Sequence, residues 1–347
     1  METKFTRVFG LKLPICQPPM AGVSFARLSV AVAESGGLGF VAAGFLSPAD
    51  ALAEFRTARD SVADKADGAV GVGYLLFPLR RSVDEREGYR AVLREKPKVV
   101  WLAFDEPREA SPKEFVEEIR KTCGGECKII YQVNSVEGAL TVADAGVDAI
   151  VAQGLEAGGH QSFQKDPKSV FTLVPTVRKA LNTKFGSRKE SPCLLAAGGI
   201  VDGQAMAAAL ALGADGVVMG TRLYASEEAG GTAEMKAELA SKQNTSRTRV
   251  WDELNVQALW PEAYGARSLQ NSLLDSEVDT STEAAQAAYR SAKKNKDYEN
   301  SPIFAGQGID RVESSEMCVD AIMKDVMKDA VGVIKDLSGT LVLGVDT

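Results

Sequence analysis

Short apolar segments rich in β-branched residues recur along the chain, and a stretch with helical spacing follows each of them. This alternation favours parallel strands that are joined by helical crossovers. The eight segments expected to form strands are Pro14–Gln17, Leu38–Ala42, Ala69–Leu75, Val99–Phe104, Lys128–Val133, Ala149–Gln153, Leu194–Ala197 and Gly216–Met219. Eight such units predict an α/β fold, a (β/α)8 barrel of the TIM type.

Three of these units share one internal plan, in Ala33–Gly44, Ala143–Gly154 and Ala211–Gly220. In each, a helix end is followed by a glycine, a buried strand and a second glycine at the strand exit. The first glycine has a structural reason, because glycine takes the left-handed helix cap at little cost. The exit glycines face the catalytic end of a barrel, where a missing side chain lets a ligand approach the backbone. The repetition therefore predicts a ligand site at the strand exits.

The exits of the last two strands carry the strongest local pattern, Ala197-Gly198-Gly199-Ile200 and Met219-Gly220-Thr221-Arg222. Loops at this position in barrels commonly bind phosphate, because bare backbone N–H groups face the ligand. Two tight turns that need glycine would explain either loop alone, but they explain the matched pair poorly. The chain has no GxGxxG or P-loop motif, so neither a dinucleotide fold nor a P-loop is predicted.

His160 is the only histidine of the chain, and it follows the exit of the sixth predicted strand in a segment expected to be a loop. A lone histidine is usually just a satisfied polar residue. At the catalytic rim of a barrel, however, an imidazole can remove a proton or donate a hydrogen bond to an oxyanion. Of the nearby polar residues, we expect Gln153 to contact a flat heterocycle and Glu156 to cap or orient a neighbour.

The charge and cysteine patterns narrow the range of partners. A formal charge of -7 and a pI near 5.1 disfavour binding to nucleic acid or to an anionic membrane. We find no apolar segment near the length of a membrane span, so we expect a soluble, cytoplasmic protein. The five cysteines are scattered, as expected for reduced thiols, and Cys123 and Cys127 lack a second ligand pair. We therefore predict no metal site.

Four segments together resemble the nitronate monooxygenase (2-nitropropane dioxygenase) family. They are Pro14-Ile-Cys-Gln-Pro-Pro-Met-Ala-Gly22, Gln153-Gly-Leu-Glu-Ala-Gly-Gly-His160, Ala196-Ala-Gly-Gly-Ile-Val-Asp-Gly203 and Ala208-Ala-Leu-Ala-Leu-Gly-Ala-Asp-Gly-Val-Val-Met-Gly-Thr-Arg222. The motifs stand in the family order. The resemblance continues through Arg247-Thr-Arg249, Gly265–Asn271 and Phe304-Ala-Gly-Gln307, so it covers nearly the whole chain.

The resemblance implies non-covalently bound FMN and a catalytic role for His160. It implies that residues 1–223 and 303–347 form the FMN-binding barrel, and that residues 224–302 form a small, mainly helical domain on the substrate side, inserted after strand eight. By position, the cofactor-binding residues would be Met20, Ala21, Gly22, Gln132, Gln153, Gly158, Gly159, Gly198, Gly199, Met219, Gly220 and Thr221. Within this set, Met20 and Gly22 would pack on the isoalloxazine ring, and the glycines after the last two strands would hold the phosphate.

The implied reaction is oxidation of an alkyl nitronate, or of a nitroalkane deprotonated with help from His160, by FMN and O2 to a carbonyl compound and nitrite. Two alternatives stay open: an FMN-dependent NAD(P)H:quinone or enoyl-thioester reductase on the same scaffold, and a non-catalytic flavin-binding protein. A monomer and a homodimer are equally compatible with the sequence.

Some positions depart from the family pattern. Gly71-Val-Gly73 stands where many members have an asparagine that contacts the cofactor, and Gln132 stands where some relatives have a basic residue. Trp251, Trp260 and Tyr264 are expected to pack within the inserted domain, with a place in the substrate pocket as the alternative.

Overall fold

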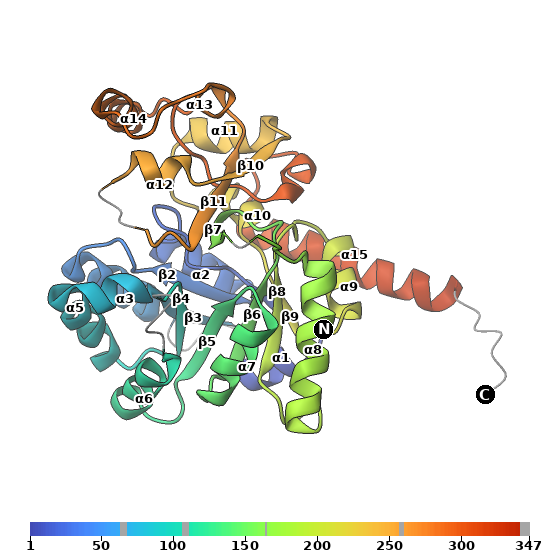
Figure 1. Ribbon diagram of the computed structural model, residues 1–347. Helices are drawn as coiled ribbons and strands as arrows, with labels where there is room; N and C mark the ends of the chain where they lie inside the picture. The colour runs from blue at the N-terminus through green and yellow to red at the C-terminus, as the bar shows by residue number, and fades with distance from the viewer. Residues whose placement is uncertain (63–67, 106–110, 164, 257–259, 341–347) are drawn as a thin grey trace.

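The computed structural model describes residues 1–62, 68–105, 111–163, 165–256 and 260–340. At its centre is a closed barrel of parallel strands in the order β1-β2-β3-β4-β5-β6-β8-β9 (Figure 1). Its strands are β1 (Ile15–Cys16), β2 (Leu38–Ala42), β3 (Ala69–Leu75), β4 (Val99–Ala103), β5 (Lys128–Val133), β6 (Ala149–Gln153), β8 (Cys193–Ala197) and β9 (Gly216–Val218). Each lies in or overlaps one predicted segment. The TIM barrel prediction is confirmed.

The register of the strands brings the predicted exits to one level. Gln153 of β6 pairs with Ala197 of β8, and Ala197 pairs with Val218 of β9. The segments that follow these three positions therefore leave the barrel side by side. They include the glycine-rich exits of the last two strands, which the sequence analysis assigned to phosphate.

Large side chains fill the barrel, so it is a packed core and not a channel. Phe40 of β2 and Trp101 of β4 meet edge to face, with ring centroids 5.3 Å apart. Phe5 and Phe9 of α1 (Lys4–Phe9) belong to the same buried cluster. A Cβ atom at Gly216, the first residue of β9, would lie 2.7 Å from the Phe5 ring, so α1 covers the amino-terminal end of the barrel.

Helices surround the barrel, as the alternating sequence pattern predicts (Figure 1). They are α2 (Ala26–Glu34), α3 (Pro48–Val62), α4 (Leu76–Arg81), α5 (Val83–Arg94), α6 (Pro112–Cys123), α7 (Val136–Asp144), α8 (Val170–Phe185), α9 (Gly203–Ala211) and α15 (Val319–Thr340). Asp202 caps α9, because its carboxylate accepts a hydrogen bond of 2.8 Å from the Ala205 N–H. A Cβ atom at Gly203 would lie 2.2 Å from the backbone nitrogen of Ala330, so glycine is required where α15 packs on α9.

Between β9 and α15 the chain leaves the barrel and forms a group of short elements, which we call the inserted segment (Figure 1). They are α10 (Thr221–Tyr224), α11 (Ala233–Ser241), β10 (Thr245–Thr248), α12 (Val250–Leu254), β11 (Tyr264–Leu269), α13 (Ser272–Asp275), α14 (Glu283–Asn295) and the 3-10 helix η1 (Gln307–Arg311). Most are helical, but β10 and β11 join β7 (Gly159–Ser162) in an antiparallel sheet of order β10-β11-β7.

This small sheet corrects the expectation that His160 lies in a loop. His160 is a residue of β7 and pairs with Ala266 of β11. This strand could not be predicted from its local sequence, because it forms by pairing with β11, which lies far along the chain. The backbone that carries the imidazole is thus held by hydrogen bonds to the inserted segment.

The five cysteines are all free, and Cys16, Cys127 and Cys193 are buried. Burial raises the pKa of Cys193 to about 12, so this thiol stays neutral and serves as a core residue. Among the helices in the described ranges, none has both the length and the apolar character that crossing a bilayer requires.

Candidate active site

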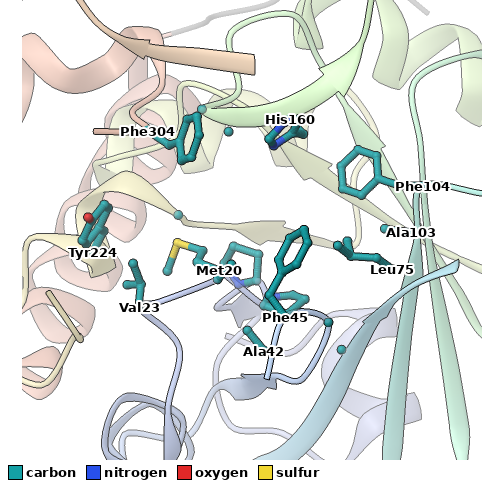
Figure 2. Close-up of a pocket in the computed structure, with 18 of the residues that line it drawn as sticks. Met20, Val23, Ala42, Phe45, Leu75, Ala103, Phe104, His160, Tyr224 and Phe304 are labelled. Carbon is teal, nitrogen blue, oxygen red and sulfur yellow. The ribbon is translucent and has the colours of Figure 1, made fainter. Parts of the chain in front are cut away.

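A cavity of about 1170 Å³ lies at the carboxyl ends of the barrel strands (Figure 2). Its wall combines strand exits of the barrel with residues of the inserted segment, including Asp252 and Trp260. Pockets for one drug-sized ligand measure roughly 300–1000 Å³. The cavity is therefore large enough for a cofactor and a small substrate together.

Most of the residues that the sequence analysis assigned to the site line this cavity. They are Met20, Ala21, Gln132, Gln153, Gly158, Gly159, His160, Gly198, Gly199, Gly220 and Thr221. Gly22 and Met219 are not among the lining residues. Gly22 lies in an exposed turn at φ +74°. Met219 is fully buried in the main hydrophobic core, and its N–H donates to the Cys16 carbonyl at 2.9 Å.

The glycines of the cavity wall differ in what requires them. Gly198 and Gly199 have φ angles of +122° and +70°, which side-chain-bearing residues rarely adopt. A Cβ atom at Gly158 would lie 2.5 Å from the backbone carbon of Ala305, so close packing of two backbones requires glycine there. At Gly220, φ is -91° and a Cβ atom would come no closer than 3.7 Å to any neighbour. Neither backbone conformation nor packing requires glycine at position 220. Its missing side chain leaves room for a ligand beside the backbone.

Two amide side chains reach the cavity from neighbouring strands. Gln132 lies at the end of β5, and Gln153 at the end of β6. The Gln153 Nε2 donates to the backbone carbonyl of His160 at 3.0 Å, so this residue also fixes the imidazole-bearing strand. Glu156 accepts hydrogen bonds from the Val170 N–H, the nearer at 3.0 Å. This confirms the expectation that its carboxylate caps a neighbour.

The departure at Gly73 has a packing explanation. A Cβ atom there would lie 2.3 Å from the Pro19 ring. Pro19, from the segment after β1, thus occupies the space that a side chain on β3 would need, and both residues line the cavity. The polar contact that the resemblance places at this position is absent from this chain.

His160 is held by a carboxylate that the sequence analysis did not single out. Its Nε2 lies 2.7 Å from Oδ1 of Asp252 on α12, and the Asp252 side chain is only 5% exposed. A carboxylate can only accept, so the neutral imidazole carries its hydrogen on Nε2 and keeps a lone pair on Nδ1. The two residues are 92 positions apart, and no local pattern links them.

Aromatic rings cover the imidazole. The Trp260 ring stacks on His160 with centroids 3.6 Å apart and planes 5° from parallel, and Phe304 lies 5.5 Å away. The expectation that Trp260 packs inside the inserted domain was therefore wrong. Trp251 also lines the cavity, although its Nε1 donates to Ser268 at 2.8 Å. Tyr264 does not line it, and its hydroxyl donates to the Asp105 carbonyl at 2.7 Å.

Comparisons with known proteins identify relatives of this chain. The family model described as nitronate monooxygenase matches residues 2–329. The chain is 34% identical over 271 residues to the nitronate monooxygenase npaC of Metarhizium robertsii, covering 74% of this chain and 72% of that one.

Two solved structures are similar over nearly the whole chain. The nitroalkane oxidase of Streptomyces ansochromogenes has a TM-score of 0.76 at 25% identity, covering 96% of this chain and all of that one (100%). FabK from Thermotoga maritima has a TM-score of 0.77 at 26% identity, covering 98% of this chain and 100% of that one. From the match to the family model over almost its full length, we conclude that this chain belongs to the nitronate monooxygenase family of enzymes.

Proposed function

We propose that the protein is an FMN-dependent nitronate monooxygenase that oxidises alkyl nitronates with O2 to carbonyl compounds and nitrite. The observation that carries the proposal is the placement of His160, held at Nε2 by Asp252, in the wall of a cavity that also contains the glycine-rich strand exits. Residues 1–223 and 303–347 would hold the cofactor. Residues 224–302 would complete the substrate side.

The residues present fit FMN. Gly198, Gly199 and Gly220 leave backbone without side chains where a phosphate would sit, and the room beside Gly220 is the space that a Cβ atom would fill. Gln132 and Gln153 offer amide groups to the polar edge of a flat heterocycle. When bound, FMN would supply the redox chemistry, taking electrons from the nitronate and passing them to O2.

Side chains of the protein would transfer the proton and position the substrate. The Nδ1 of His160 is available to take a proton from the carbon of a neutral nitroalkane, or, once protonated, to donate to an oxygen of the nitronate. Asp252 orients the imidazole through its hydrogen bond to Nε2. Trp260 and Phe304 exclude water from the imidazole faces, which strengthens these interactions.

Replacing His160 by Asn tests the proton-transfer role. Oxygen consumption and nitrite release are measured with nitroethane and with its preformed nitronate. General-base catalysis contributes about 10²–10⁴-fold, so we expect His160→Asn to lower kcat/KM by at least about 10²-fold for nitroethane and much less for the nitronate. Equal losses on both substrates would remove the base role.

Anaerobic mixing with NAD(P)H tests the reductase alternative. We expect the oxidised flavin spectrum to persist with NAD(P)H and to bleach with a nitronate. The reverse pattern would show a reductase. A flavin that neither compound bleaches would show a protein that binds the cofactor without this chemistry.

A further inference from the structure

We propose that Phe45, Phe104 and Trp260 form an aromatic subsite beside His160 that takes an aryl substituent on the reacting carbon. The inference rests on the proposed function and names a substrate class within it, the aryl nitronates. All three rings line the cavity that contains His160. Figure 2 shows Phe45 and Phe104 lying with His160 around one open space.

The three rings come from separate parts of the chain and meet at one place. Phe45 follows β2, Phe104 follows β4, and Trp260 follows α12. The centroid of the Trp260 ring lies 6.1 Å from that of Phe45 and 5.3 Å from that of Phe104. These are the distances of direct aromatic packing, so the subsite is a continuous apolar surface.

Phe45 is the most exposed of the three aromatic residues named above. The residue is 52% exposed although it lines a cavity. Covering an apolar ring of this kind with an apolar group removes both surfaces from water, which is favourable. The uncovered ring is therefore a place where part of a ligand can bind.

Phe104 adds a second, independent observation. Its backbone has φ +57°, a conformation that bulky residues rarely adopt and that tends to occur at functional sites. The backbone carbonyl of Phe104 accepts a hydrogen bond of 3.1 Å from the Phe77 N–H, which holds this turn in place. The strained turn places the Phe104 ring in the cavity wall.

The position of Trp260 connects the subsite to the chemistry. Trp260 covers one face of the imidazole, so whatever packs on the subsite lies next to His160. A substituent on the carbon from which His160 takes a proton would reach these rings. An aryl group would pack on them at offset or edge-to-face angles, whereas a charged substituent would lose hydration without gaining a charged partner from the three rings.

The test compares two preformed nitronates, those of phenylnitromethane and nitroethane, in the FMN-loaded enzyme and in Phe45→Ala. The ratio of the two kcat/KM values is compared between proteins, so differences in intrinsic reactivity cancel. We expect Phe45→Ala to lower the ratio of phenyl to ethyl substrate roughly tenfold, the effect of one lost aromatic contact with its buried area. Phe171→Ala is the matched control, because Phe171 is 71% exposed on α8 and lies outside the cavity wall; its ratio should equal that of the wild type.

A measurement of FMN binding separates a substrate subsite from a cofactor contact. The Kd of FMN should stay within about twofold in Phe45→Ala. A large rise in that Kd, with equal losses on both substrates, would show that the ring holds the cofactor and would overturn the proposal. So would an unchanged substrate ratio.

If neither nitronate is oxidised, the proposed function fails, but the subsite can still be judged. The Kd of neutral phenylnitromethane is then measured from changes in the FMN absorption spectrum. Weaker binding by roughly tenfold in Phe45→Ala but not in Phe171→Ala would support the subsite. Equal Kd values in all three proteins would overturn it.

Discussion

The Nε2 atom of His160 lies 2.7 Å from the Oδ1 atom of Asp252, so a side-chain hydrogen bond joins β7 to α12 of the inserted segment. The second oxygen of Asp252 is buried and has no hydrogen-bond partner among the described residues. The imidazole is therefore the hydrogen-bond partner of this carboxylate, and the inserted segment supplies it.

Replacing Asp252 by Asn tests this positioning role. The amide can donate to Nε2 and so stabilise the wrong tautomer, which leaves Nδ1 without its lone pair. We expect kcat for neutral nitroethane to fall by at least about tenfold, with a smaller loss on the preformed nitronate. Asp252→Glu should recover part of the activity.

Glu253→Gln is the matched control for this variant. Glu253 lies next to Asp252 on α12, but its contact with Arg249 is a long 3.9 Å ion pair with a half-exposed carboxylate. The substitution should leave kcat near the wild-type value. If Asp252→Asn behaves in the same way as this control, the hydrogen bond has no role in turnover.

Gly220→Ala tests the phosphate end of the cavity. The protein itself has room for the methyl group at this position, so the melting temperature of the apoprotein should change little. A bound phosphate would meet the methyl group, and we expect the Kd of FMN to rise by about tenfold or more. Gly125→Ala, where a Cβ atom meets nothing within 4 Å, is the control. Unchanged FMN affinity in Gly220→Ala would place the phosphate elsewhere.

Asp215 is predicted to stabilise the barrel. Its side chain is fully buried, accepts from the Leu194 N–H at 2.8 Å, and pairs with Arg178 and Arg188. Asp215→Ala leaves the buried Arg178 without its carboxylate partner, and we expect the free energy of unfolding to fall by about 3–5 kcal/mol. Urea denaturation measures this change. A loss below about 1 kcal/mol, as expected for an exposed ion pair, would contradict the prediction.

Glu95 is predicted to make the free energy of unfolding depend on pH in the acid range. Hydrogen bonds from Arg56 and Arg59 lower the pKa of Glu95 from an ordinary 4.5 to about 2. Because this pKa is lower in the folded state, the stabilisation is complete above about pH 4.5 and is lost as the pH falls towards about 2. Glu95→Gln should therefore flatten the fall in the free energy of unfolding across this window. Parallel curves for the two proteins would show that Glu95 contributes nothing to it.

The barrel could be predicted from the sequence because each of its strands and helices has a recognisable local pattern of apolar residues. The eight apolar segments and the glycines that end helices need no information from distant residues. The glycines at the strand exits could be placed for the same reason, since the barrel topology brings the strand exits to one end.

The residues around His160 could not be predicted in this way. Asp252 reaches the imidazole from 92 positions away, and β7 exists only because β11 pairs with it. The polar contact expected at Gly73 is absent, and Pro19 fills the space that a side chain would need there. Trp260 belongs to the inserted segment by sequence, but its ring stacks on His160. Each of these relations depends on tertiary contacts that leave no periodic trace.

The proposed function requires that FMN bind in the cavity next to His160. It is tested most directly by the absorption spectrum of the apoprotein after incubation with FMN and removal of the free cofactor, followed by anaerobic addition of the nitronate of nitroethane. We expect a bound oxidised flavin that bleaches when the nitronate is added. A protein that stays colourless after incubation with FMN would contradict it.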